Sequence, residues 1–210
     1  MLKFPTNVTW GTDPEAFLQL HKRIIGSERL IPRNGIVIPN AGRIVRDGVQ
    51  FEFQPRTSNT IEGLATNIAS LFTALDIRMH SKRGISCCFD GLVEVSKTEL
   101  AALSPETRRL GCMPSHNFYG STPISVDPFT YRKRSSGGHI HMGLSAPIYN
   151  PAIGIDNRTR LVPLCDIFVG NQCVLLDRDP GAAERRQNYG RAGEYRLPPH
   201  GLEYRTTSNF

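Results

Sequence analysis

The sequence predicts an α+β protein with a sheet of which one face carries chemically active side chains. Residues 49–54 alternate between apolar and polar, as in a strand, and residues 59–80 keep a helical apolar period. Polar residues two apart also follow a glycine at several places, and such residues point to the same face of a strand. These pairs are Asp13 with Glu15, His139 with His141, Glu194 with Arg196, and Glu203 with Arg205.

The composition is that of one soluble domain spanning residues 1–210. Its end at Phe210, directly after a predicted strand, leaves open that the chain is truncated at the C-terminus. The 25 basic and 19 acidic residues give a net charge of +6, which suits either anionic partners or ordinary solubility. Five cysteines without a CxxC pair indicate reduced thiols and a cytoplasmic setting. We expect no membrane partner, because no signal peptide and no sufficiently long apolar run is visible.

The N-terminal quarter is predicted to be strand-rich. Residues 8–18 form a first strand, in which Pro14 favours an edge or a bulge because it cannot donate to a ladder. Residues 28–54 form two or three strands, with a hairpin turn at Asp47-Gly48. Glu52 lies on the polar face of the last of them, where the alternative to a functional role is a solvated outer face.

A long helix is predicted over residues 59–80, with Asn59 as its cap and Glu62 at the capping-box position. Its apolar stripe should pack on the apolar face of the sheet. The stripe consists of Ile61, Leu64, Ile68, Leu71, Phe72 and Leu75. Residues 84–95 are strand-like, and a short helix follows over residues 97–103 with Ser96 as its cap.

The segment 111–136 is predicted to be a long loop, and such loops in compact domains are often functional. It ends in Arg132-Lys133-Arg134, which is either a solvated basic turn or a cluster that faces phosphate. The strand 137–143 follows, and its two glycines allow the backbone to bend or to approach a ligand closely.

A second long helix is predicted over residues 156–176. Its expected buried side is Leu161, Leu164, Cys165, Phe168, Val169 and Cys173. Residues 177–191 are polar and rich in arginine, and we expect a surface or active-site loop there. Two strands, 193–197 and 201–207, complete the chain.

Carboxylates and a histidine on one face of a sheet indicate a site for divalent cations. Oxygen ligands with one imidazole favour Mg²⁺ or Mn²⁺, whereas zinc prefers more histidine or cysteine. Arginines near such carboxylates indicate a phosphate-bearing substrate, because phosphoryl transfer depends on charge neutralisation and positioning. The pattern therefore fits a nucleotide better than a neutral substrate.

Four segments, in this order, resemble the glutamine synthetase-like carboxylate–amine ligases, and most closely their phage and bacterial amidoligase branch, the COOH–NH2 ligase type 2. The segments are Gly11-Thr12-Asp13-Pro14-Glu15-Ala16-Phe17, Asp47-Gly48-Val49-Gln50-Phe51-Glu52-Phe53, Gly137-Gly138-His139-Ile140-His141-Met142-Gly143, and Tyr189 to Arg196 with Gly201 to Thr206. The resemblance implies a glutamine synthetase-like catalytic domain, in which helices pack on one face of a curved antiparallel sheet.

The resemblance also implies roles for individual residues. The implied metal ligands are Asp13, Glu15, Glu52, His139 and Glu203. The first two supply one ligand to each of two metal sites, although the family more often has Glu where this chain has Asp13. The implied nucleotide contacts are His141 and Arg205, and the basic cluster read as facing phosphate adds Arg134. The residues implied in catalysis are Glu52, Arg191, Arg196 and Arg205.

The activity implied by the resemblance is ATP-dependent formation of an amide or peptide bond through an acyl phosphate, with Mg²⁺ or Mn²⁺ as cofactor. Its partners would be a carboxylate and an amine, each a small molecule or a peptide, in the cytoplasm of a bacterium or of a phage-infected host. One alternative is a catalytically inactive relative that serves as a phage virion or tail protein. A homo-oligomer is also open, and nothing in the sequence resembles a nucleic-acid-binding motif.

A cupin-like metal oxygenase, which also uses Gly-x-His-x-His, is disfavoured. That pattern requires a glutamate a few residues after the second histidine. The chain instead continues from His141 with Met-Gly-Leu-Ser-Ala-Pro.

Overall fold

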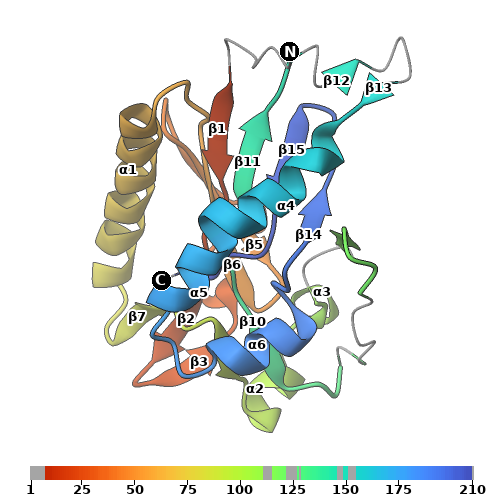
Figure 1. Cartoon of the computed structure of the whole chain (residues 1–210). Helices are drawn as coiled ribbons and strands as arrows, with labels where there is room; N and C mark the ends of the chain where they lie inside the picture. The colour runs from red at the N-terminus through yellow and green to blue at the C-terminus, as the bar shows by residue number, and fades with distance from the viewer. Residues whose placement is uncertain are drawn as a thin grey trace.

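The computed structural model describes residues 8–110, 115–121, 127, 129–145, 149–150 and 155–209. The fold is α+β, as predicted. Two antiparallel sheets curl into a half-barrel, and helices lie on its outside (Figure 1).

The first sheet has five antiparallel strands and carries the histidine pair. Their order is β1 (Thr9–Thr12), β11 (Ile140–Gly143), β15 (Gly201–Tyr204), β14 (Glu194–Arg196) and β9 (His116–Asn117). Met142 and Leu202 pack on one face with Val162. His141 pairs with Glu203 across β11 and β15, so both project from the opposite face. The predicted alternation of an apolar and a chemically active face is confirmed.

The second sheet is formed mainly by the N-terminal quarter. Its order is β3 (Arg23–Ile25), β2 (Glu15–Leu20), β6 (Gln50–Pro55), β5 (Gly42–Asp47) and β4 (Ile36–Ile38), and β7 (Ile85–Cys88) also pairs with β2. Phe51 and Phe53 share one face, as predicted, and are fully buried there in a core with Leu71 and Leu75, with ring centroids 5.3 Å apart.

The chain passes from one sheet to the other at Asp13-Pro14. The predicted strand 8–18 is therefore two strands, because Pro14 has no N–H to continue a ladder. The Glu15 N–H donates to the Gly137 carbonyl at 2.8 Å, and the Phe53 N–H donates to the Pro14 carbonyl at 2.9 Å. Asp13 consequently belongs to the first sheet's edge and Glu15 to the second sheet.

Helix α1 (Ile61–His80) packs beside the second sheet. Leu71 and Leu75 are buried in the core, and each such burial stabilises the fold by about 1.5–3 kcal/mol. The predicted cap was wrong: Thr60, not Asn59, accepts the Gly63 N–H at 3.1 Å. Ile61 is 71% exposed, because the helix begins beyond the edge of the core.

The middle of the chain forms short elements. They are the 3-10 turn Ser27–Arg29, β8 (Leu92–Glu94), α2 (Lys97–Ala102), α3 (Pro105–Arg108) and β10 (Lys133–Ser135), with β12 (Tyr149–Asn150) and β13 (Ile155–Asp156) further on. Ser96 caps α2 as predicted. Within the predicted loop 111–136, β9 and β10 are strands, and residues 111–114, 122–126 and 128 lie outside the described part.

The second long helix runs from Arg158 to Leu176 and changes its winding along the way. It starts as a 3-10 turn (Arg158–Leu161), continues as α4 (Val162–Cys165), has a π-helical segment (Asp166–Gly170) and ends as α5 (Asn171–Leu176). In Figure 1 it crosses in front of the first sheet. By length and composition alone it could cross a membrane. Only 17% of its most apolar window is buried within the fold.

Two predictions for the C-terminal half were wrong. Leu164 and Phe168 were expected to be buried but are 48% and 72% exposed, because Asp166 and Gly170 occupy the side that faces the sheet. The segment 177–191 was expected to be a loop, but it contains α6 (Ala182–Asn188). Arg185 on that helix is 1% exposed. The sequence of the helix has no apolar stripe, and the buried guanidinium of Arg185 holds the helix on the fold instead.

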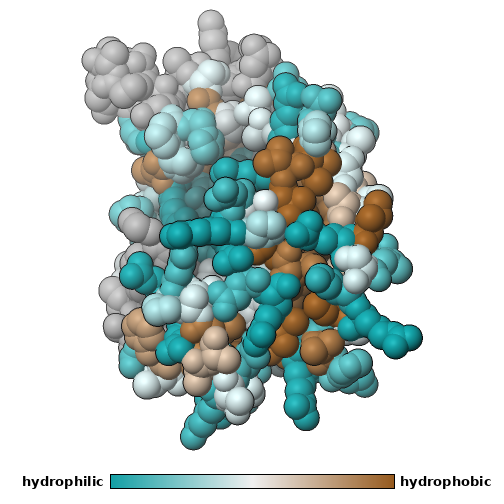
Figure 2. Space-filling view, turned by 180° about the vertical axis from the view of Figure 1, so that it is seen from behind, coloured by the Kyte–Doolittle hydropathy of each residue, from teal (hydrophilic) through white to brown (hydrophobic). Residues whose placement is uncertain are grey.

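The face opposite α4 and α5 is hollowed in its upper part, and mainly hydrophilic residues line the hollow (Figure 2).

Candidate metal centre

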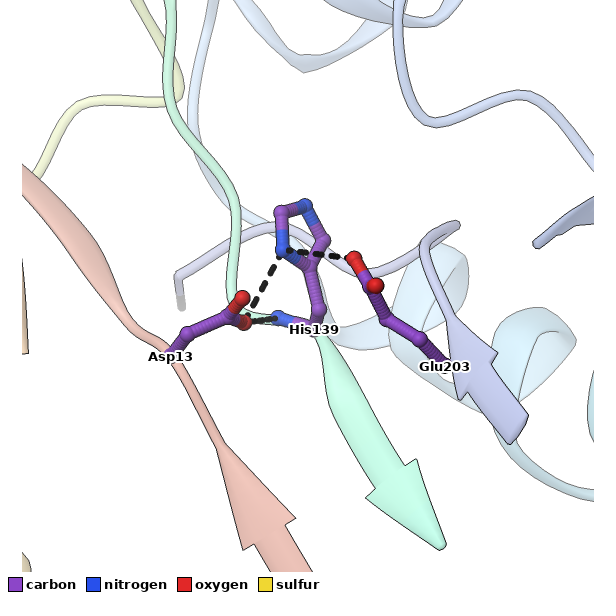
Figure 3. A group of neighbouring side chains, drawn as sticks. All are labelled: Asp13, His139 and Glu203. Atoms are coloured by element: carbon purple, nitrogen blue, oxygen red, sulfur yellow. Dashed lines mark hydrogen bonds and ion pairs between the residues drawn. The ribbon is translucent and has the colours of Figure 1, made fainter. Parts of the chain in front are cut away.

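Three side chains from distant parts of the chain converge at the edge of the first sheet. Asp13, His139 and Glu203 each offer a ligand atom, and these atoms lie within 4.8 Å of one another. The Nδ1 atom of His139 is 2.9 Å from Oδ1 of Asp13 and 3.7 Å from Oε1 of Glu203 (Figure 3). All three point into the same space, and His139 is 1% exposed. We call this group the first cluster.

A second cluster consists of Glu15, Asp47 and Glu52, whose carboxylate oxygens also lie within 4.8 Å of one another. Glu15 and Glu52 are directly opposite each other in the β2–β6 ladder. Glu15 is fully buried and accepts the Gly137 N–H at 2.8 Å. Like charges at facing ladder positions are destabilising, so this pairing needs a proton or a cation to offset the repulsion.

The pKa values of these carboxyls show how unfavourable several negative charges are in this cluster. Burial first, and then Asp47, Asp13 and Glu52, raise the pKa of Glu15 well above its ordinary value. Burial, together with the charge of Asp13, raises the pKa of Glu52 to about 8. The second cluster therefore keeps protons at neutral pH unless another positive charge replaces them.

Asp13 behaves in the opposite way. Burial alone would raise its pKa, but His139 and His141 outweigh burial and hold the pKa below its ordinary value. The Nε2 atom of His141 lies 3.1 Å from Oδ2 of Asp13, so the two carboxylate oxygens face one imidazole each. Burial disfavours the charged form of His141, but the contact with Asp13 prevails and raises the pKa of this histidine.

Tyr189 holds the far side of the His139 ring. Its hydroxyl lies 2.6 Å from Nε2 of His139, and Nη2 of Arg205 donates to the same hydroxyl at 3.0 Å. A hydroxyl can either donate or accept, so Tyr189 supports both neutral tautomers of His139. When it accepts from Nε2–H, the Nδ1 lone pair faces Asp13 and Glu203, as a metal ligand would.

The arginines predicted to act in the site divide into two groups. Arg205 is buried and forms an ion pair with Glu203, and Nη1 of Arg196 lies 3.6 Å from the same carboxylate. Both therefore border the first cluster. Arg191 pairs with Glu194 at 2.9 Å.

Arg134 contacts backbone carbonyls in another part of the fold. It donates to the carbonyls of Tyr131, Lys133 and Arg108, the last two at 3.0 Å each. These bonds tie β10 to the end of α3. Its predicted contact with the nucleotide stays a prediction.

Sequence reasoning missed three residues of this region. Asp47 was noted only as a turn residue, yet it pairs with Gln50 across the hairpin and so shares a face with Glu52. Counting back through the two-residue turn would have found it. Tyr189 and Arg185 have no such signal, because they lie in a segment whose helix was not predicted.

Each of the five predicted metal ligands lies in one of the two clusters, and Asp13 and Glu15 are divided between them. The donor set fits hard divalent cations, since it contains five carboxylates, one imidazole and no thiolate. Because these acids are buried and close together, a bound cation would offset their mutual repulsion.

The matching family model supports the same class of protein. Residues 124–210 match the family described as Phage phiEco32-like COOH.NH2 ligase-type 2, which is a family of carboxylate–amine ligases by its description. The match confirms the amidoligase branch predicted from the motifs, and it covers His139, His141 and Glu203. No curated protein and no solved structure matches the chain.

Proposed function

We propose that this protein is an ATP-dependent carboxylate–amine ligase with a glutamine synthetase-like catalytic domain and two divalent cations. The family match supports the reaction class. The observation that carries the cation sites is the facing pair Glu15 and Glu52, two buried acids whose repulsion a cation would offset. The antiparallel half-barrel with a hydrophilic hollow is compatible with the proposed fold.

The two clusters would hold one cation each. Asp13, His139 and Glu203 are the ligands of the first site, and the acids of the second cluster are the ligands of the other. Mg²⁺ or Mn²⁺ bound there would supply charge neutralisation for a transferring phosphoryl group.

The surrounding side chains have roles that follow from their positions. Arg205 and Arg196 border the first cluster, where they would face the phosphates of ATP. When Arg205 binds phosphate, its ion pair with Glu203 would open, and Glu203 could bind the cation. His141 is 21% exposed and would contact the nucleotide. Arg191 and Arg134 are further candidates for phosphate contacts.

The proposed reaction has two steps. A substrate carboxylate takes the γ-phosphoryl group of ATP and becomes an acyl phosphate, and ADP leaves. The nitrogen of an amine then attacks the acyl carbon, loses a proton and displaces phosphate, which leaves an amide. The carboxylate and the amine belong to small molecules or peptides.

Calorimetric titration with Mn²⁺, followed by thermal shift with Mg·ATP, tests the proposal. Wild-type protein should bind Mn²⁺ and gain thermal stability with Mg·ATP. His139→Ala and Glu203→Ala should each abolish the Mg·ATP shift and remove the Mn²⁺ binding of the first site. Glu62→Ala, which removes an exposed acid on α1, is the control and should change neither.

Two results would contradict the proposal. A folded wild-type protein that shows no response to Mn²⁺ or Mg·ATP would favour the alternative of a non-catalytic virion or tail component. A Mg·ATP shift and an Mn²⁺ stoichiometry that are both unchanged by the two substitutions would show that Asp13, His139 and Glu203 hold no cation.

A further inference from the structure

The helix from Arg158 to Leu176 turns polar residues towards the sheet and large apolar residues towards solvent. Its buried positions after the first turn are Val162, Asp166 and Gly170, and the half-buried Leu161 and Cys165 pack beside Val162. Asp166 accepts hydrogen bonds from the Tyr204 hydroxyl at 2.6 Å and the Tyr119 hydroxyl at 2.9 Å. A polar anchor thus holds this helix on the sheet, where an apolar stripe is the usual arrangement.

Close packing against the sheet accompanies this anchor. A Cβ added at Gly170 would lie 2.2 Å from the Tyr204 hydroxyl, so the helix backbone approaches the tyrosine directly. Asp166 also accepts the Gly193 N–H at 3.1 Å. These contacts fix which side of the helix faces outward.

The outward side carries large apolar residues before and after the polar Asn171 and Gln172. The exposed fractions are 48% for Leu164, 54% for Ile167, 72% for Phe168, 43% for Val174, 70% for Leu175 and 63% for Leu176. Together these side chains expose on the order of 600 Å² of apolar surface, at the upper end for a typical monomer. The area is also close to the ~800 Å² that each partner contributes to a standard interface. We call this surface the α4–α5 face.

A polar residue, Asn171, is exposed within the α4–α5 face, between Phe168 and Leu175. Inside an interface between two helices, an asparagine fixes the register of pairing at a cost in stability. The same asparagine would be unfavourable against lipid chains.

The charges complete the pattern of a protein interface. Arg160 and Arg178 are exposed at the two ends of the face, and the two acids between them, Asp166 and Asp177, are buried. A centre without charge and a charged rim are typical of protein–protein interfaces. The anchoring of Asp166 on Tyr204 also disfavours a membrane-spanning position, because the helix would have to leave the sheet.

We propose that the α4–α5 face binds a second copy of this chain, helix against helix, to form a two-fold symmetric dimer. A two-fold axis near Phe168 and Asn171 would bring the most exposed apolar side chain to the centre of the interface. An inclined crossing of the two helices would keep the arginines at the rim and apart. The dimer is independent of the proposed catalytic function, since no ligand of either cluster belongs to the face.

Sedimentation velocity over a range of about 1–100 μM tests the dimer, since affinities in this range are typical of moderate interfaces. Wild-type protein should sediment as a dimer at the upper concentrations. Phe168→Asp should raise the dissociation constant by at least about 30-fold, as expected for a central aromatic residue of an interface. Ile77→Asp is the matched control, because Ile77 is 68% exposed on another helix, and it should leave the dimer unchanged.

Circular dichroism should show that both variants fold, since neither residue is buried. Asn171→Leu should favour association, either by tightening the dimer or by adding a larger species. A wild-type protein that stays monomeric at 100 μM, or equal effects of Phe168→Asp and Ile77→Asp, would overturn the proposal. So would flotation of monomeric wild type with phosphatidylglycerol vesicles that Phe168→Asp abolishes, because the face would then bind a bilayer.

Discussion

Replacement of Gly190 by alanine should destabilise the protein far more than a change at an ordinary turn glycine. Gly190 has a φ of +73°, and a Cβ there would lie 2.2 Å from Nη1 and 2.8 Å from Cζ of Arg185. The guanidinium of Arg185 donates to the carbonyls of Ser136 at 2.6 Å and of Thr207 at 2.9 Å. It therefore joins α6 to the segment before His139 and to the C-terminal segment after β15.

The magnitude follows from two contributions. The left-handed conformation costs alanine about 1–2 kcal/mol relative to glycine. Displacement of Arg185 removes one or two buried hydrogen bonds from a charged donor, at about 1.5–3 kcal/mol each. We expect Gly190→Ala to lower the free energy of unfolding by about 2.5–8 kcal/mol.

Gly120→Ala is the matched control. Gly120 has a φ of +80°, but no atom lies within 4 Å of the added Cβ. Only the conformational cost of about 1–2 kcal/mol should remain. Urea unfolding monitored by circular dichroism measures both variants. Equal losses in the two would refute the argument that Arg185 is a buried anchor.

Three further predictions concern single side chains. Tyr189→Phe should weaken Mn²⁺ binding by about 10-fold or more in calorimetry, because His139 loses the partner that orients its ring; unchanged affinity would contradict this role. Without divalent cations, stability should fall as pH rises from about 4.5 to about 8, because folded Glu52 holds its proton more tightly than the unfolded chain. Glu52→Gln should reduce this slope in urea unfolding at pH 5.5 and 8.5, and an identical slope would refute the assignment. Asp166→Asn should lower the free energy of unfolding by about 2–3 kcal/mol without changing Mn²⁺ affinity, and a loss of affinity would show that Asp166 belongs to the site.

Local patterns in the sequence were sufficient for most strands and for the family. The alternation over residues 49–54 predicted the buried Phe51 and Phe53 face, because strand periodicity depends only on neighbouring residues. The spacing of His139 and His141 placed both imidazoles on one face, where each now meets Asp13. The motifs also predicted the ligase family that the comparison found.

Tertiary structure decided which groups meet. Asp13 and His139 are 126 residues apart, and only the pairing of β1 with β11 brings them together. Asp47 became part of a cluster through the register of β5 on β6, which its role in the turn concealed. Such contacts depend on strand order and register, and these arise from the packing of the whole chain.

The helix 158–176 shows the same division most clearly. Its sequence determined that it would be helical and amphipathic, but the apolar stripe was assigned to the core. The structure turned Leu164 and Phe168 of that stripe outward and kept Leu161 and Cys165 against the core, because Asp166 finds two tyrosine hydroxyls and a backbone N–H on the sheet. Buried polar partners of this kind come from distant segments, so a local period predicts that a helix has two faces, and only tertiary packing decides which of them is inside.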